Sequence, residues 1–196
     1  MTNFGPVPTL KSTCQLRVNW RYLRMLAAAT LGLFVIPPLT QLSGLRINTS
    51  YSLPIGLYAV SNDLAANLIE FCPTGVYSEV SAGRGYRAKG VCPDGAVPLL
   101  KPIVAHEGDE VDLGKDGIAV NGTRLPNTAP LGIDRKGRPL DPFPFGRYRV
   151  AQGEVWVAST YNPGSFDSRY MGPIQFSLVR SRLRPVCTFH KFATQS

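Results

Sequence analysis

The feature that most constrains this chain is an uncharged, largely apolar stretch near its amino terminus, Met25–Leu45. Its length is close to the roughly 20 residues that an α-helix needs to cross a bilayer. Arg21 and Arg24 lie just before it, so the positive-inside rule predicts a cytoplasmic amino terminus. We therefore expect one transmembrane helix, with everything from Arg46 onward outside the cytoplasm.

Two prolines leave a second interpretation of this stretch open. Pro37 and Pro38 limit its most apolar part to Met25–Ile36, which has the length of the hydrophobic core of a signal peptide. Ser43-Gly44-Leu45 is a poor cleavage site, so we favour a retained anchor over a cleaved signal, and the basic flank argues against a buried core helix. The expected organisation is a basic cytoplasmic tail (1–24), an anchor or signal segment (25–45) and an external domain (46–196).

Basic residues outnumber acidic ones, and the formal net charge is +8. Such an excess indicates nucleic-acid binding when the basic residues form one patch with interleaved aromatic residues. Here about half of the excess lies before the apolar stretch, and three more arginines lie near the carboxyl terminus. These residues are Lys11, Arg17, Arg21 and Arg24, followed by Arg180, Arg182 and Arg184. Because no such patch is present in the sequence, we expect no nucleic-acid partner.

Beyond the anchor, short runs of strand-forming residues alternate with turn residues. The abundance of Gly and Pro, with only 17% charged residues, is typical of a loop-rich β protein. The pair Asn121-Gly122 favours a hairpin turn, and Asn127–Phe145 is expected to be an irregular surface excursion. Past residue 62, Leu64–Ile69 is the one weak helix candidate. Strands are expected at Gly56–Val60, Val97–Ala105, Glu110–Leu113, Ile118–Val120, Arg147–Val150 and Glu154–Ala158. We predict a mainly β domain.

The chain has four cysteines, and two of them share a sequence context. Cys72 and Cys92 each precede a proline and enclose a Gly-rich stretch, which favours a disulfide in an oxidising compartment. Two unrelated buried thiols are the alternative. Cys14 precedes the apolar stretch and should stay reduced. No Cys-x-x-Cys pair is present and the histidines are only His106 and His190, so no metal site is expected.

Lys101 is the candidate general base. It interrupts an apolar run, with Val97–Leu100 before it and Pro102–Ala105 after it. Burial among these neighbours disfavours the ammonium form and lowers the pKa of the lysine. A neutral amine can then accept the proton of a serine hydroxyl. The alternative is a strand lysine that extends its charged end to water.

Ser52 is the candidate nucleophile. It lies a few residues after the apolar stretch, and Pro54 biases Leu53 toward an extended backbone. The Ser52 backbone N–H and the Ser50 hydroxyl are candidate donors to a tetrahedral oxyanion. Ordinary turn chemistry is the alternative for such a Ser-rich loop. Neither histidine lies in a motif that favours a Ser-His-Asp triad.

Three segments carry a shared pattern. They are Asn48–Tyr58 (Asn-Thr-x-x-Ser-Leu-Pro-x-Gly-Leu-Tyr), Val97–Asp109 (Leu-Leu-Lys, then Gly-Asp) and Gly164–Pro173 (Ser-Phe-Asp-Ser-Arg-Tyr-x-Gly-Pro). Together they resemble the type I signal peptidase family, and within it the conjugative-transfer branch, the TraF-type peptidases. The Cys-Pro pairs, the Val120-Asn121-Gly122 turn and Asp134-x-x-Gly137-Arg138-Pro139-Leu140 are similar to that branch as well. The resemblance runs in order from about Asn48 to Pro185.

The resemblance implies a role for each site residue. Ser52 would be the nucleophile and Lys101 its general base. Ser50 would supply the oxyanion-hole hydroxyl, and Ser165 would orient the lysine amine. The two remaining residues, Asp167 and Arg169, would form a charged pair that supports the site.

The resemblance also implies a fold, a location and a substrate. A signal-peptidase-like, bent β-sheet domain would lie in the periplasm, behind an anchor in the bacterial inner membrane. It would be a serine endopeptidase that matures exported precursors, such as a conjugative pilin, in contact with the conjugative secretion machinery. No cofactor is required. Either water releases the acyl-enzyme, or the substrate's own amine captures it and yields a cyclic product; the sequence leaves both open.

The chain departs from the family pattern beside Lys101. Pro102 stands where many relatives have a basic residue, and proline cannot donate a backbone hydrogen bond. Glu107 stands where relatives usually have proline. These departures motivate one alternative, a catalytically degenerate scaffold protein of a conjugative pilus or secretion complex. A self-cleaving repressor with a similar dyad would need a DNA-binding motif in place of residues 1–45.

Overall fold

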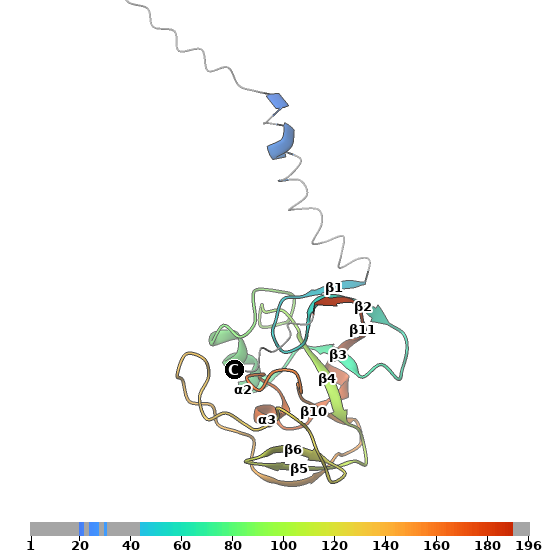
Figure 1. The fold of residues 1–196 in the computed structure, drawn as a ribbon, viewed down its shortest axis with the longest axis vertical. Helices are drawn as coiled ribbons and strands as arrows, with labels where there is room; N and C mark the ends of the chain where they lie inside the picture. Colours follow the sequence, from blue (N-terminus) through green and yellow to red (C-terminus); the bar gives the residue numbers. More distant parts are fainter. Residues whose placement is uncertain (1–19, 22–23, 28–29, 31–43, 190–196) are drawn as a thin grey trace, which may run out of the picture. The chain divides into compact units, whose positions relative to one another are not determined.

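The computed structural model describes residues 20–21, 24–27, 30 and 44–189, and the chain divides into two units, Met1–Leu42 and Ser43–Ser196 (Figure 1). The described residues of the first unit, 20–21, 24–27 and 30, are helical. Most of the expected anchor at 25–45 lies outside the described residues. Within the part of the chain that is described, no helix has the length and apolar character needed to span a membrane.

The second unit contains a seven-stranded antiparallel sheet with the order β1-β2-β11-β3-β4-β9-β10. Its strands are β1 (Leu45–Asn48), β2 (Ile55–Ser61), β3 (Leu68–Phe71), β4 (Leu99–Ala105), β9 (Glu154–Val157), β10 (Ile174–Gln175) and β11 (Val179–Phe189). The prediction of a mainly β domain is therefore confirmed. The curl of this sheet brings Arg46 of β1 within reach of Glu70 of β3, where the guanidinium and carboxylate lie 2.9 Å apart.

A smaller antiparallel sheet has the order β7-β6-β5-β8. Its strands are β5 (Glu110–Gly114), β6 (Gly117–Val120), β7 (Thr123–Arg124) and β8 (Gly146–Arg149). Asn121 and Gly122 form the turn between β6 and β7, and both have positive φ, as expected for a hairpin turn at this pair. The six predicted strands all correspond to observed ones, with shifts of one or two residues at their ends.

The helices differ from the prediction. The candidate helix at Leu64–Ile69 is wrong: Leu64 is exposed, and Ile69 is buried in β3, where it pairs opposite Lys101. Instead, α2 (Gly75–Gly83) follows β3, α3 (Ser168–Met171) precedes β10, and a 3-10 turn (Phe176–Leu178) precedes β11. The reason that α2 lacks a periodic signal is that it buries only Ser81.

The segment around α2 is organised by a disulfide and by a buried arginine. The expected disulfide between Cys72 and Cys92 is present and encloses α2. Inside this loop the buried Arg87 pairs with Asp94 and donates to Ser81 Oγ at 2.9 Å. This segment thus depends on cross-links more than on an apolar helix face.

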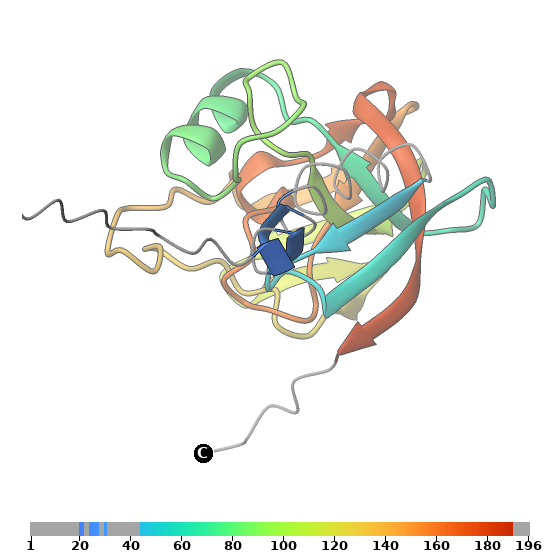
Figure 2. The ribbon, with the colours of Figure 1, turned by 90° about the horizontal axis from the view of Figure 1, so that it is seen from above.

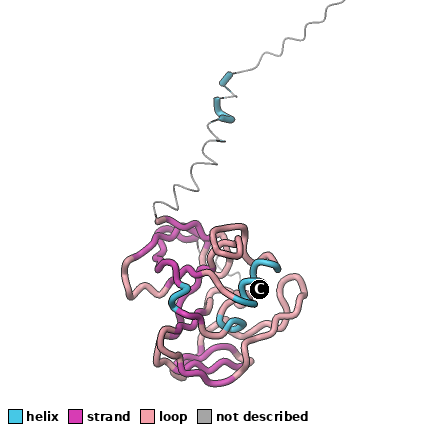
Figure 3. Tube along the Cα trace, turned by 180° about the vertical axis from the view of Figure 1, so that it is seen from behind, coloured by secondary structure: helices cyan, strands magenta, loops and turns pink. Residues whose placement is uncertain are grey.

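The excursion 127–145 is irregular, as expected, and packs beside the α2 segment. Tyr86 donates to Asp134 Oδ2 at 2.7 Å, and Arg84 donates to the Pro139 carbonyl at 2.6 Å. Figures 2 and 3 show α2 and this excursion on the same side of the domain.

Strand β9 separates two hydrophobic cores. Because successive side chains of a strand point to opposite faces, Val155 and Val157 enter the core of the large sheet, whereas Trp156 and Ala158 enter the core beneath the small sheet. The segment after β9 is therefore anchored on both sides. That segment begins with Ala158 and Ser159, which are both fully buried.

Candidate active site

Strand alternation directs Lys101 into the interior. Buried and half-buried residues alternate along β4, and Lys101 lies in the buried set at 2% exposure. Its Nζ lies 2.6 Å from Ser52 Oγ and 2.7 Å from Ser165 Oγ. Three segments that are distant in sequence thus meet at one amine: the turn between β1 and β2, strand β4, and the loop after β9.

Pro102 leaves this arrangement intact. Its carbonyl accepts from the Ala158 N–H of the loop after β9 at 3.2 Å, and the neighbouring Ile103 N–H donates to Asn67 O. The backbone donor that proline lacks would lie on the Ala158 side of β4. The pairing of Lys101 with Ile69 on the other side of the strand is kept.

Burial lowers the pKa of Lys101 from 10.5 to about 8. Desolvation is the main cause, while Asp167 favours the ammonium form and Arg169 disfavours it. At a pKa of about 8, roughly a tenth of the amine is neutral at pH 7. In that form the lone pair of Nζ can accept the hydroxyl proton of Ser52.

Asn48 organises the turn that carries Ser52. Its side-chain amide is buried and donates to three carbonyls of the turn, those of Ser50, Leu53 and Pro54, at 3.1–3.3 Å. Its Oδ1 accepts from the Ser50 backbone N–H at 3.1 Å. The sequence pattern included Asn48 without assigning it a role, because most of its partners are backbone atoms.

The two expected oxyanion donors differ in the structure. The Ser50 hydroxyl donates its single proton to Asn48 Oδ1 at 2.8 Å. It would have to rotate away from Asn48 to serve an oxyanion. Within residues 44–189, by contrast, the Ser52 backbone N–H has no acceptor at hydrogen-bond distance.

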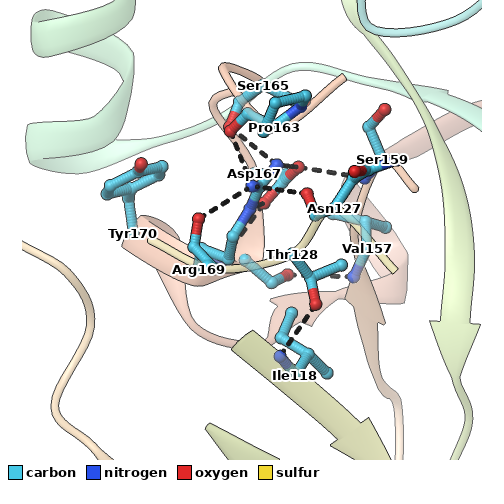
Figure 4. A network of polar contacts seen from close by, with 12 residues as sticks. Ile118, Asn127, Thr128, Val157, Ser159, Pro163, Ser165, Asp167, Arg169 and Tyr170 are labelled. Atoms are coloured by element: carbon cyan, nitrogen blue, oxygen red, sulfur yellow. Dashed lines mark hydrogen bonds and ion pairs between the residues drawn. The ribbon is translucent and has the colours of Figure 1, made fainter. Parts of the chain in front are cut away.

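Asp167 and Arg169 form a fully buried ion pair (Figure 4). Both oxygens of Asp167 accept from the guanidinium at 2.8 Å. The same guanidinium donates to the carbonyls of Pro163 at 2.7 Å and Ser165 at 3.1 Å. The pair therefore holds the loop that presents Ser165 to Lys101.

Two further residues of this loop bind the turn that carries Ser52. The Ser159 hydroxyl donates to the Ser52 carbonyl, and the Asn162 amide donates to the Tyr51 carbonyl at 3.0 Å. Sequence reasoning missed both residues. Neither belongs to the patterned segment Gly164–Pro173, and their partners are again backbone oxygens. Their only signal is their position between β9 and Ser165.

His106 and Glu107 lie outside this constellation, in the turn between β4 and β5. The His106 backbone N–H donates to Asp109 Oδ2 at 2.8 Å, and Glu107 is exposed. Across the described ranges, no group of three or more His, Cys, Asp or Glu side chains is arranged to hold a metal ion.

Comparison with known proteins finds relatives over most of the chain. The family model described as signal peptidase, peptidase S26, matches residues 18–187. Plasmid transfer protein TraF of Escherichia coli is 37% identical over 151 residues, which cover 75% of this chain and 84% of that protein. Probable conjugal transfer protein TraF of Sinorhizobium fredii is 31% identical over 189 residues, covering 93% and 98%. A crystal structure of a signal peptidase I from Enterococcus faecalis matches with 17% identity and a TM-score of 0.35, covering 64% of this chain and all of that one.

Proposed function

Because this chain belongs to the peptidase S26 family of signal peptidases, we propose that it is a membrane-anchored serine endopeptidase that matures an exported precursor of a conjugative transfer system. In this proposal Ser52 is the nucleophile and Lys101 the general base. The observation that carries it is the 2.6 Å contact between Lys101 Nζ and Ser52 Oγ, in a site where the amine is buried and its pKa is about 8.

The acylation step follows from these contacts. Neutral Lys101 accepts the Ser52 proton while Oγ attacks the scissile carbonyl. The Ser52 N–H is available to the resulting oxyanion. Lys101, now protonated, gives its proton to the leaving amine as the C–N bond breaks. The Ser165 hydroxyl accepts a hydrogen bond from Lys101 Nζ at 2.7 Å and keeps the lysine amine directed at Ser52.

Release of the acyl-enzyme uses the same base. Lys101 takes a proton from an attacking water, and Ser52 leaves with that proton. An amine of the substrate itself can replace water, and a cyclic product then forms. Mass spectrometry of the matured pilin separates the two outcomes, since a ring lacks the mass of one water relative to the linear product.

The proposed location follows from the apolar stretch and from the relatives. An anchor at 25–45 in the inner membrane would hold the catalytic domain at the periplasmic surface, where a membrane-bound precursor is also concentrated. The relatives are named for plasmid and conjugal transfer, which supports a precursor of the conjugation machinery, in the first place the pilin.

The test is precursor processing in membranes, with the co-encoded pilin precursor as substrate. We expect the wild type to cleave it, and Ser52→Ala and Lys101→Ala to lose cleavage while remaining folded. Matched controls are Ser177→Ala and Lys115→Ala, which change the same residue types at exposed positions and should cleave normally.

Two results would overturn the proposal. If both Ser52→Ala and Lys101→Ala still process the precursor, Ser52 and Lys101 are not the catalytic dyad. A wild type that is inert on every co-encoded precursor would favour the scaffold protein that Pro102 and Glu107 brought into consideration.

A further inference from the structure

We infer that Asn162 and Ser159 are positioning residues that aim the nucleophile's own backbone N–H at the oxyanion, an inference that rests on the proposed function. Neither residue would touch the substrate. Each holds one carbonyl of the turn that carries Ser52. Together they fix the two peptide planes on either side of the Ser52 Cα.

Asn162 controls the first of these planes. The Tyr51 carbonyl and the Ser52 N–H belong to one planar peptide unit, and no peptide bond of the described chain is cis. In a trans unit the C=O and the N–H point in opposite directions. The Asn162 amide binds Tyr51 O at 3.0 Å, so the Ser52 N–H points in the opposite direction within the same plane, away from Asn162. There the N–H has no acceptor within residues 44–189.

The orientation of the Asn162 side chain is fixed by its other end. Its Oδ1 accepts from the Gly164 backbone N–H at 2.8 Å. Only the NH₂ group can therefore face Tyr51 O. The loop thus determines which end of the amide meets the nucleophile's turn.

Ser159 controls the second plane. Its hydroxyl donates to the Ser52 carbonyl and accepts from the backbone N–H groups of Tyr161 and Asn162, at 3.2 and 3.1 Å. Because those two donors occupy its lone pairs, its proton is directed at Ser52 O. With both neighbouring planes held, the φ and ψ of Ser52 are fixed, and so is the direction of its Cα–Cβ bond; its Oγ is held by the contact with Lys101 Nζ at 2.6 Å.

The hydrogen bonds that Ser159 and Asn162 make to the turn are held rigidly, because Ser159 is also bound to the buried ion pair. Ser159 is fully buried, and its backbone N–H donates to Asp167 Oδ2 at 3.0 Å (Figure 4). Asp167 is in turn held by Arg169. One loop therefore connects the ion pair near Lys101 with the turn that carries the Ser52 N–H. The direction of this N–H is important for oxyanion binding, because the other expected donor, the Ser50 hydroxyl, is bound to Asn48.

The test is the kinetics of pilin-precursor cleavage by the full-length protein carrying Asn162→Asp or Asn162→Ala. Asn162→Asp keeps the acceptor for Gly164 and removes the donor to Tyr51. Loss of a whole oxyanion donor lowers kcat by about 10²–10³-fold, so a misdirected one should lower it by roughly 10–100-fold. KM should change by less than about threefold, because the interaction is made in the transition state.

The pH profile separates positioning from a structural role. It is read in Asn162→Ala, because an added carboxylate would itself raise the pKa of a nearby lysine. We expect the inflection of kcat/KM to stay where it is in the wild type, with only the plateau lowered. A loop that had merely loosened would move the inflection, since Ser165 and the burial of Lys101 depend on the same loop.

Asn127→Asp is the matched control. The Asn127 amide also donates to a carbonyl of this loop, that of Thr160 at 2.8 Å, but to no part of the nucleophile's turn. It should retain kcat within about threefold. Unchanged kcat in both Asn162 variants would overturn the inference, as would a shifted inflection or a lowered melting temperature that accounts for the loss. A wild type without Ser52-dependent cleavage would instead remove the proposed function, and the inference with it.

Discussion

At the residue scale, the proposed chemistry depends on the protonation state of Lys101. Only the neutral amine can act as base, and burial lowers its pKa to about 8. We therefore expect kcat/KM to rise about tenfold per pH unit below pH 8 and to level off above it. Initial rates of precursor cleavage between pH 6 and 10 measure this. An inflection near 6 would indicate a different base.

The same burial has a consequence for stability. The pKa of Lys101 is lowered on folding, so the unfolded chain binds the extra proton, and the penalty is complete below pH 8. It fades as the pH rises from about 8 to 10.5. Lys101→Met removes the charge and keeps the length, so it should stabilise the fold at pH 7, on the order of 1–3 kcal/mol.

Thermal melts of wild type and Lys101→Met at pH 7 and pH 10 test this linkage. The higher melting temperature of the variant at pH 7 should shrink toward the wild-type value at pH 10. Lys115→Met, at an exposed turn lysine, should change neither. A variant less stable than the wild type at pH 7 would show that the two hydrogen bonds of the amine outweigh its desolvation.

Residues that act through side chains could be predicted, and those that act on the backbone could not. Lys101 interrupts an apolar run and Ser165 lies in the patterned segment Gly164–Pro173, so both can be identified in the sequence. Asn48, Ser159 and Asn162 bind carbonyl oxygens, which every residue possesses. Their partners are set by the tertiary fold, and nothing in the local sequence identifies them.

At the element scale, strands were predictable where side-chain alternation determines burial. Strand β4 shows this alternation clearly. Strand β11 does not, because its arginines are spaced along exposed and half-buried positions. Helix α2 escaped prediction for a related reason: it buries little, and the Cys72–Cys92 bond and the Arg87 network hold its segment.

That disulfide leads to a prediction for the element it closes. Cys72 directly follows β3, and Phe71 of β3 pairs with Leu99 of β4, the strand that contains Lys101. Closing a loop of 20 residues stabilises the fold by about 3 kcal/mol in the loop-entropy model. Reductant, or the double variant Cys72→Ala and Cys92→Ala, should therefore lower the melting temperature.

Activity should respond differently from stability. The contacts of Lys101 with Ser52 and Ser165 involve neither cysteine, so the folded fraction of the double variant should keep kcat/KM within about threefold at 20 °C. Cys187→Ala, at the exposed free cysteine of β11, is the matched control for stability. A melting temperature that does not change with reductant would argue against the Cys72–Cys92 disulfide.

At the scale of the whole molecule, the chain separates into two units with different expected tasks. The second unit contains both hydrophobic cores and all of the candidate site residues. It should therefore fold and retain the dyad without residues 1–43. Soluble peptide spanning the cleavage site should be cleaved by this fragment at nearly the full-length rate.

Processing of a membrane-bound precursor should depend on the first unit. Tethering enzyme and substrate to one surface raises their effective concentration, an effect worth about 10²–10⁴-fold in linked systems. We expect the fragment lacking 1–43 to process the membrane-bound precursor at least ~10-fold more slowly than the full chain. Replacing 1–43 by an unrelated transmembrane helix should restore the rate if anchoring is its task. If the replacement does not restore it, residues 1–43 contact the precursor themselves; if deletion has no effect on membrane-bound substrate, the anchor plays no part in finding it.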